Sequence, residues 1–265
     1  MAANNLAWVA GIGMLIGIAV AVPTWVASVG LRDASLADRL WSAFVAAPAG
    51  FYAWSLGADA RITILVSLIV VWAVRLAVYV TARNWGHGED RRYQAIRARN
   101  QPRFALKSLW LVFVLQAVLG WVVGLPVLAA AGGGAWSGWD SLGVAVAAGG
   151  LACEAVADAQ LARFRREPGS RERVMDLGLW RYSRHPNYFG ELCLWWGVAL
   201  MGLSGGGWAH AWCLSSPLLM TLLLLRVSGV TLLEKDIGDR RPAYRDYVAR
   251  TSAFIPWPPR RGVAP

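Results

Sequence analysis

The sequence predicts an all-α protein that crosses a membrane with about seven helices. Of its 265 residues, 57% are hydrophobic and only 16% are charged, whereas about a quarter of the residues in a soluble domain are charged. Apolar segments of about 20 residues, long enough to cross a bilayer, recur along the chain. The basic residues alternate with these segments, and their positions predict the orientation of the helices as well as their number.

We expect seven spans, which cover roughly residues 6–29, 40–56, 62–82, 109–131, 141–161, 188–203 and 208–233. Pro23 should kink the first span, and Ser35 and Asp38 in the following link are candidate helix caps. The first span is too long for the apolar core of a signal peptide and no basic segment precedes it, so we expect it to be retained. Residues 1–30 then form the first transmembrane helix, and residues 31–265 form essentially one membrane domain.

Positive charge is concentrated in three of the links between spans. Of the 26 Lys and Arg residues, seven lie in each of the segments 83–107, 163–184 and 235–261, and none lies near Gly133 or Gly206 in the intervening links. Basic links stay on the cytoplasmic side. An odd number of spans then places the N-terminus outside and the C-terminus in the cytoplasm. The net charge of +10 therefore reflects topology, and we expect no nucleic-acid partner.

Ionisable side chains gather at the predicted cytoplasmic ends of four spans. Charges inside a bilayer are costly, so they mark functional positions by default. The groups that share a helix face or a span end are Arg75 with Tyr79 and Arg83, Glu154 with Asp158 and Arg165, Glu191 with Trp195, and Arg226 with Glu234. We expect them to line one polar cavity that opens to the cytoplasm.

The densest polar and aromatic stretch runs from Gly178 to Glu191, at the start of the sixth span. Pro186 presets the turn into the helix, and Asn187 or the residues before it can cap the helix. The free N–H groups of that first turn, together with Arg181 and Arg184, suit a phosphate group. A basic interfacial loop that binds lipid head groups is the alternative interpretation.

The run Arg184-His185-Pro186-Asn187-Tyr188-Phe189-Gly190-Glu191, followed by Trp195-Trp196-Gly197, resembles the C-terminal signature of the steroid 5-alpha-reductase family, and most of all its bacterial branch. The resemblance extends from Asp33 to Pro256. Other matching segments are Asp33-x-Ser35-x-x-Asp38-x-x-Trp41, Glu89-Asp90-x-Arg92-Tyr93-x-x-x-Arg97, Leu115-Gln116, Glu154-x-x-x-Asp158-x-Gln160-x-x-x-Phe164, Ser228-Gly229-Val230, Leu233-Glu234-Lys235, Tyr244-x-x-Tyr247 and Thr251-Ser252-x-Phe254-x-Pro256. The His-Pro-x-Tyr-x-Gly core alone also occurs in isoprenylcysteine carboxyl methyltransferases and sterol reductases.

This resemblance implies an enzyme of the bacterial inner membrane whose seven helices enclose NADPH from the cytoplasmic side. Such an enzyme reduces a carbon–carbon double bond conjugated to a ketone in a lipid-like substrate, such as a 3-oxo-4-ene steroid. Asp158 and Arg165 would hold the adenosine and phosphate end, and the loop from Arg92 to Arg97 would close over the phosphates. The full set of implied cofactor-binding residues is Arg92, Arg97, Glu154, Asp158, Arg165, Arg181, Tyr182, Arg184, His185, Asn187, Tyr188, Glu191, Trp195, Glu234 and Tyr244.

Reduction of an enone places negative charge on its carbonyl oxygen, which needs a hydrogen-bond donor. In animal members of the family this donor is attributed to a Glu in the second span and a Tyr in the third, but residues 40–56 contain neither Glu nor Gln. We expect Tyr79 and Glu191 to act in catalysis, and Tyr79, Tyr52 and Arg75 to contact the substrate. Tyr52, Asp38 and Glu191 are reserve donors. A packing role in a helix interface is the alternative for Tyr79.

Two other functional classes remain open. An S-adenosylmethionine-dependent methyltransferase shares the His-Pro core, but Asp158-x-Gln160, Arg165 and the Trp-Trp-Gly run favour the reductase. A non-enzymatic lipid-binding protein is the second. For His185, cofactor contact and turn packing are equal alternatives. We expect a monomer without a metal site, and we interpret Cys153, Cys193 and Cys213 as small buried hydrophobic residues.

Overall fold

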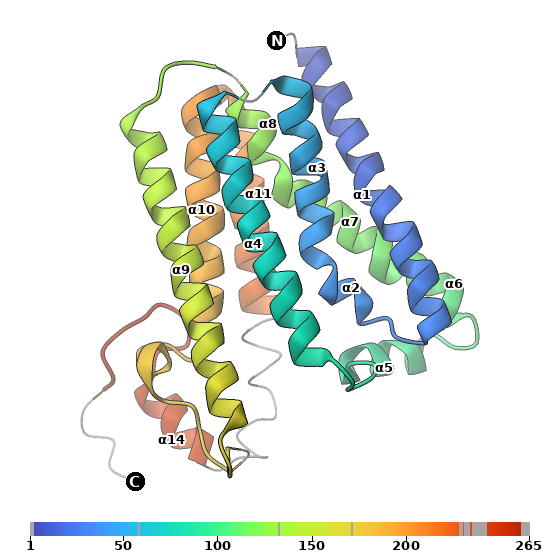
Figure 1. The fold of residues 1–265 in the computed structure, drawn as a ribbon, viewed down its shortest axis with the longest axis vertical. Coiled ribbons are helices and arrows are strands. Elements are labelled where there is room, and N and C mark those ends of the chain that lie inside the picture. The colour runs from blue at the N-terminus through green and yellow to red at the C-terminus, as the bar shows by residue number, and fades with distance from the viewer. Residues whose placement is uncertain are drawn as a thin grey trace. The chain divides into compact units, whose positions relative to one another are not determined.

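A computed structural model describes residues 3–57, 59–131, 133–170, 172–227, 230, 234 and 243–260 of the chain (Figure 1). All regular secondary structure in these ranges is helical, so the predicted all-α class is confirmed. The chain divides into two compact units, described separately below. Unit 1 contains residues 1–141 and 198–216, and unit 2 contains residues 142–197 and 217–265.

Unit 1 is built around helix α3, which packs against α1, α4 and α7. Phe44, Val45, Ala49 and Tyr52 of α3 are fully buried in this contact. The helices of the unit are α1 (Ala3–Leu31), α2 (Leu36–Arg39), α3 (Trp41–Leu56), α4 (Ala60–Asn84), α5 (Arg91–Arg99), α6 (Phe104–Ser108), η1 (Leu109–Val114), α7 (Leu115–Gly124), α8 (Pro126–Ala130) and η3 (Trp208–Leu214).

Two aspartates cap helices of unit 1, but the expected caps do not. Asp59 accepts a hydrogen bond from the N–H of Ile62 at the start of α4, and Asp90 caps α5 in the same way. Ser35 precedes α2 without capping it, because its hydroxyl donates to Asp33 instead. Asp38 binds side chains of the segment around α5. The predicted capping roles of Ser35 and Asp38 are therefore wrong.

A buried ion pair in unit 1 holds the link that contains Gly133 and Gly134, between α8 and α9. Arg61 of α4 donates two hydrogen bonds to Asp140, at 2.7 and 3.0 Å, and the two residues are only 3% and 0% exposed. Arg61 also donates to the carbonyl oxygens of Gly133 and Ala135, and the Ser204 hydroxyl donates to Asp140. Buried charges persist only when they are paired and hydrogen-bonded in this way. The pair therefore fixes the link that joins α8 to α9.

Unit 2 contains most of helix α9 (Gly138–Arg166), the first half of α10 (Pro186–Gly206), and α11 (Ser215–Leu222) from Pro217 onward. Shorter elements complete it: η2 (Gly178–Arg181), η4 (Leu223–Val227) and α14 (Ala243–Arg250). Parts of the matching segments around Ser228-Gly229 and Leu233-Glu234-Lys235 lie outside the described residues, although Glu234 itself is described.

Helices α9 and α10 approach so closely that their contact requires glycine. A Cβ atom on Gly150 would lie 2.5 Å from the carbonyl oxygen of Gly190, and one on Gly190 would lie 2.6 Å from the amide nitrogen of Glu154. Farther along, a Cβ atom on Gly197 would lie 2.5 Å from the carbonyl oxygen of Gly143. Small residues at such spacings let the backbones of membrane helices touch. The contact holds Glu154 beside the first turns of α10.

Five of the described helical segments are long and apolar enough to cross a membrane, which indicates an integral membrane protein. They are Asn5–Leu31, Ala60–Asn84, Phe104–Ala130, Gly138–Arg166 and Trp208–Val227, which correspond to the first, third, fourth, fifth and seventh expected spans. The second expected span forms α3, which has 16 residues, and the sixth forms α10, which has 21. Both exist as helices, and their crossing of the membrane stays a prediction.

The glycine contact predicts opposite effects of alanine at two adjacent positions. Gly150→Ala should lower the free energy of unfolding by about 1–3 kcal/mol, because the helices must separate to admit a methyl group. Gly149→Ala is the matched control, since nothing lies within 4 Å of its added Cβ atom and alanine favours a helix by about 1 kcal/mol over glycine. Thermal unfolding in detergent measures both. Equal shifts for the two variants would contradict the close approach.

Candidate functional site

Residues 178–191 of unit 2, called the signature segment below, pack against the last turns of α9. The indole N–H of Trp180 donates to the carbonyl oxygen of Ala157 at 3.0 Å, and the N–H of Leu179 donates to the side chain of Gln160 at 3.0 Å. Gly178 has φ +60°, and a Cβ atom there would overlap the Gln160 amide. Only glycine fits this position. Pro186 is the first residue of α10, as expected from its fixed φ.

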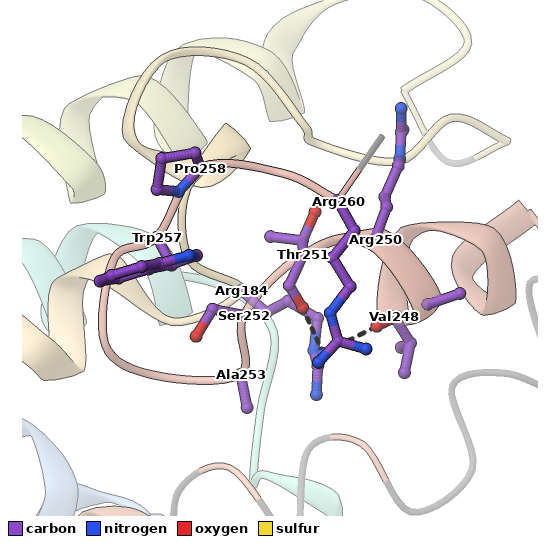
Figure 2. A pocket seen from close by; sticks show the side chains of 10 residues that line it. Arg184, Val248, Arg250, Thr251, Ser252, Ala253, Trp257, Pro258 and Arg260 are labelled. Atoms are coloured by element: carbon purple, nitrogen blue, oxygen red, sulfur yellow. Dashed lines mark hydrogen bonds between the residues drawn. The ribbon is translucent and has the colours of Figure 1, made fainter. Parts of the chain in front are cut away.

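Arg184 joins three segments that are distant in the sequence. Its guanidinium donates to both carboxylate oxygens of Glu234, at 2.7 and 2.8 Å. It also donates to the carbonyl oxygens of Thr251 and Val248, at 2.7 and 3.2 Å (Figure 2). The residue is 8% exposed. The structure therefore places this arginine in a buried bidentate ion pair, the geometry in which guanidinium binds carboxylate most strongly.

His185 lies on the same carboxylate. Its Nε2 atom is 2.9 Å from Glu234, and its ring stacks on Tyr188 with centroids 5.5 Å apart and planes at 7°. A carboxylate only accepts hydrogen bonds, so Nε2 carries the hydrogen. Of the two alternatives for His185, the packing role is present in the structure, and cofactor contact stays a prediction.

The bonds to Glu234 outweigh the cost of its partial burial. Burial raises the pKa of a carboxyl group, but the hydrogen bonds from His185 and Arg184 lower the pKa of Glu234 to about 2. The same contact raises the pKa of Arg184 above its ordinary value, although burial opposes it. Glu234 is therefore a permanently charged anchor at neutral pH.

A second group of predicted residues is buried along α9 and α10. Glu154 and Asp158 lie one turn apart on α9, and Asn187 and Glu191 lie one turn apart on α10; the Asn187 amide donates to Asp158 at 3.1 Å. Glu154, Asp158 and Glu191 are buried, at 2%, 4% and 7% exposure, and Trp195 is fully buried. The structure thus places these carboxylates on the contacting helices α9 and α10. The polar cavity that the sequence predicts around them stays a prediction.

The remaining predicted residues of unit 2 are divided between surface and interior. Arg165, Arg181 and Tyr182 are exposed. Tyr244 is buried against the ring of Tyr247, with centroids 5.4 Å apart, and burial raises its pKa to about 12. The Tyr247 hydroxyl donates to the carbonyl oxygens of Trp180 and Ser183. These hydrogen bonds hold α14 against the signature segment.

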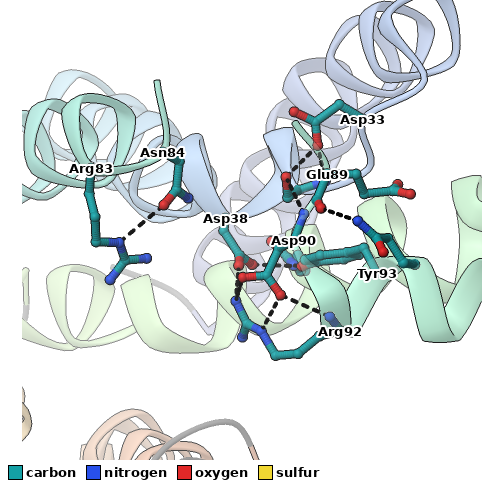
Figure 3. Close-up of polar contacts among 11 residues, drawn as sticks. Asp33, Asp38, Arg83, Asn84, Glu89, Asp90, Arg92 and Tyr93 are labelled. Carbon is teal, nitrogen blue, oxygen red and sulfur yellow. Dashed lines mark hydrogen bonds and ion pairs between the residues drawn. The ribbon is translucent and has the colours of Figure 1, made fainter. Parts of the chain in front are cut away.

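In unit 1, three of the segments that carry the family resemblance meet in one network (Figure 3). Arg92 donates to Asp38 and Asp90 at 2.7 and 2.9 Å, and the Tyr93 hydroxyl donates to Asp38 at 2.6 Å while accepting from Gln116. Burial raises the pKa of Tyr93, and the charge of Asp38 adds to this effect. The hydroxyl therefore stays protonated and acts as a fixed donor.

Arg97 makes a second ion pair in the same network. Its guanidinium donates to both oxygens of Glu89, at 2.7 and 2.8 Å, and Glu89 also accepts from the N–H of Ala34. Burial raises the pKa of Glu89, but these bonds lower it by a larger amount. The pKa of Glu89 is therefore below its ordinary value. The arginines at 92 and 97 thus order their own loop, and its closure over a cofactor stays a prediction.

The predicted substrate residues lie on α3 and α4 of unit 1. Tyr52 is fully buried, and its hydroxyl lies against Gly13 of α1, where a side chain would overlap it. This position fits helix packing. The guanidinium of Arg83 lies 5.8 Å from the ring centroid of Tyr79, as their spacing on one face predicts. Arg75 and Tyr79 are both partly buried.

A pocket of about 320 Å³ lies beside Arg184, and the sequence did not predict it (Figure 2). Arg250, Arg260 and Trp257 contribute to its lining. The available signals were the third basic segment and the Thr251-Ser252-x-Phe254-x-Pro256 run. Neither signal indicated that residues 248–260 lie beside Arg184, because this contact joins segments that are more than 60 residues apart in the sequence.

The low pKa of Glu234 predicts an acid-sensitive contribution to stability. Its carboxyl has a lower pKa in the folded state than its ordinary 4.5, so the unfolded state takes up the proton first as the pH falls. A contribution of up to about 3 kcal/mol should be complete above about pH 4.5 and be lost toward pH 2.

Thermal unfolding of the wild type and Glu234→Gln across this pH range tests the prediction. The stability difference between them should shrink as the pH falls. Glu167→Gln is the control, because Glu167 forms an exposed ion pair with Arg173. A pH-independent difference for Glu234→Gln would show that the carboxylate is not a charged anchor.

Comparison with known proteins gives a family for this chain. The model of a family described as "Protein of unknown function (DUF1295)" matches residues 24–251. A Schizosaccharomyces pombe protein named Uncharacterized protein C594.04c is 25% identical over 274 aligned positions, which cover 92% of this chain and 79% of the yeast protein. No solved structure matches significantly. The family match includes the signature segment, all of α14 and the unit 1 network, and the chain belongs to the DUF1295 family.

Proposed function

We propose that the protein is a membrane-embedded, NADPH-dependent reductase of a carbon–carbon double bond conjugated to a ketone in a lipid-like substrate. We infer seven spans, with the N-terminus outside and the cofactor site on the cytoplasmic side of the inner membrane. The segregation of basic residues supports this topology. The link of the DUF1295 family to steroid 5-alpha-reductase-like proteins supports the reaction class.

The observation that carries the proposal is the convergence of the signature residues within unit 2. The Asn187 amide of α10 donates a hydrogen bond to Asp158 of α9. The buried Glu154 and Glu191 lie on the same two helices. Buried carboxylates gathered in one place usually serve a ligand, because burial without a function is costly. Trp195 adds a fully buried aromatic surface.

The donor set fits a phosphorylated dinucleotide in two parts. The carboxylate and amide oxygens of Asp158 and Asn187 suit ribose hydroxyls and a nicotinamide amide. The exposed guanidinium of Arg181, within the signature segment, suits a phosphate group. Arg184 already binds Glu234, so we assign it to fixing the site, together with His185.

When bound, NADPH would supply the hydride for the reduction. The residues of the chain bind and orient the reactants and exclude water. As negative charge develops on the substrate carbonyl oxygen, the Tyr79 hydroxyl donates a hydrogen bond to it. The proton that completes the saturated product comes ultimately from water.

Binding measurements separate the reductase from the methyltransferase alternative. Isothermal titration calorimetry of the full chain in detergent should show saturable binding of NADPH and none of S-adenosylmethionine. Arg181→Gln should weaken NADPH binding by about 1.5–3 kcal/mol, the value of a hydrogen bond to a charged group. Arg184→Ala is less informative, because it removes the bidentate partner of the partly buried Glu234 carboxylate and so disturbs the signature segment itself.

Arg103→Gln is the charge-matched control, because Arg103 is an exposed residue of unit 1. Binding of S-adenosylmethionine in place of NADPH would assign the chain to the methyltransferases. Equal affinity in the wild type and Arg181→Gln would exclude a phosphate contact at Arg181.

Tyr79→Phe tests the proposed enolate donor. The variant should bind NADPH normally but turn over a 3-oxo-4-ene steroid about 100- to 1,000-fold more slowly, the usual cost of losing one oxyanion donor. The rate of NADPH oxidation measures turnover. Tyr52→Phe is the control, because Tyr52 packs against Gly13. An unchanged rate in Tyr79→Phe, with slow turnover in Tyr52→Phe, would transfer the role to Tyr52.

A further inference from the structure

The pocket beside Arg184 carries a surplus of positive charge. Three arginines line it, and two of them are neutralised: Arg184 by Glu234, and Arg250 by Asp176. Arg260 makes no ion pair within the part of the chain that the structure describes, although its backbone N–H is fixed to the carbonyl oxygen of Arg250 at 3.0 Å. A pocket with one uncompensated guanidinium attracts an anion.

The floor and wall of the pocket supply further hydrogen-bond donors. The N–H groups of Ser252 and Ala253, both lining residues, donate to no other described residue. The Arg184 guanidinium has five N–H groups, and four of them are used in the bonds to Glu234, Val248 and Thr251. A tetrahedral anion with several acceptor oxygens, such as a phosphate ester, can accept hydrogen bonds from several donors that line one pocket.

The rim of the pocket is apolar and faces outward. Trp257 lines the pocket and is 69% exposed, and Ile255 on the same segment is 63% exposed. Prolines at 256, 258 and 259 stiffen the segment. An exposed Trp beside arginines is typical of the boundary between the hydrocarbon and the head groups of a membrane.

The pocket also lies at the basic end of a candidate membrane span. The N–H of Trp257 donates to the carbonyl oxygen of Tyr182 at 2.9 Å, and Trp180 of the same segment donates to Ala157 of α9. Helix α9 is a candidate span that ends in Arg163, Arg165 and Arg166. The pocket is thereby held at the end of a membrane helix where lipid head groups are expected.

We propose that this pocket binds the phosphate of an anionic membrane phospholipid, with Arg260 as the ligand at its mouth and Trp257 and Ile255 inserted among the lipid head groups. The site is separate from the proposed cofactor site, which is built on the buried residues of α9 and α10. It would fix the C-terminal segment to the membrane surface, and through Arg184 and Thr251 it would stabilise the signature segment.

Native mass spectrometry of the delipidated full chain, titrated with phosphatidylglycerol or phosphatidylcholine, tests the proposal. The first phosphatidylglycerol should bind at least about tenfold more tightly than phosphatidylcholine. Arg260→Gln should lower the affinity for phosphatidylglycerol about tenfold. Arg99→Gln, which removes one exposed charge of unit 1, should change the affinity by less than about twofold. Trp257→Ala should weaken binding of the same lipid.

Four results would overturn the proposal. They are equal affinity for the two lipids, equal losses in Arg260→Gln and Arg99→Gln, displacement of the lipid by inorganic phosphate at similar concentration, and displacement by NADPH. The third would identify a site for soluble anions, and the fourth would assign the pocket to the nucleotide. NADPH affinity measured on the same Arg260→Gln sample should equal that of the wild type, which separates failure of the lipid site from failure of the proposed reductase.

Discussion

The backbone contact between α9 and α10 is the constraint on which the candidate site in unit 2 depends. Where Gly150 meets Gly190, no side chain separates the helices, so the residues one and two turns farther along α9 lie against the start of α10. Asp158 can then reach Asn187, and Glu154 is buried beside them. Without this approach Asp158 and Asn187 would be too far apart to form their hydrogen bond. In a membrane each would then carry the full cost of its burial.

Ion pairs form the second level of organisation, and they change how the arginines are interpreted. The signature arginine at 184 is saturated by Glu234 and by carbonyl oxygens of the C-terminal segment. Arg92 and Arg97 are likewise held by carboxylates of their own network. These pairs hold loops in place, so the proposed phosphate contacts are assigned to exposed arginines such as Arg181 and Arg260. Sequence matching identifies the residues shared with the family, whereas the contacts show which of these residues have a structural role.

The C-terminal segment is an integral part of unit 2. Ser183 donates to the carbonyl oxygen of Phe254, and the N–H of Arg184 donates to that of Ser252. Tyr247 completes the contact from α14 through its bonds to Trp180 and Ser183. The segment thus packs against the signature turn, and together with the end of α14 and Arg184 it lines the pocket.

The sequence by itself determined the helical class, five of the spans that the structure describes as long apolar helices, and the residues of the signature turn. It could do so because hydrophobic run length, charge segregation and turn chemistry are local properties. It did not determine the partners of those residues. Ser35 and Asp38 looked like caps, yet Asp38 binds Arg92 and Tyr93, more than 50 residues away. Arg184 looked free for phosphate, yet Glu234 and Thr251 occupy it. Only tertiary structure decided these outcomes, because a buried charge takes whichever partner the packing of distant segments brings within hydrogen-bond reach.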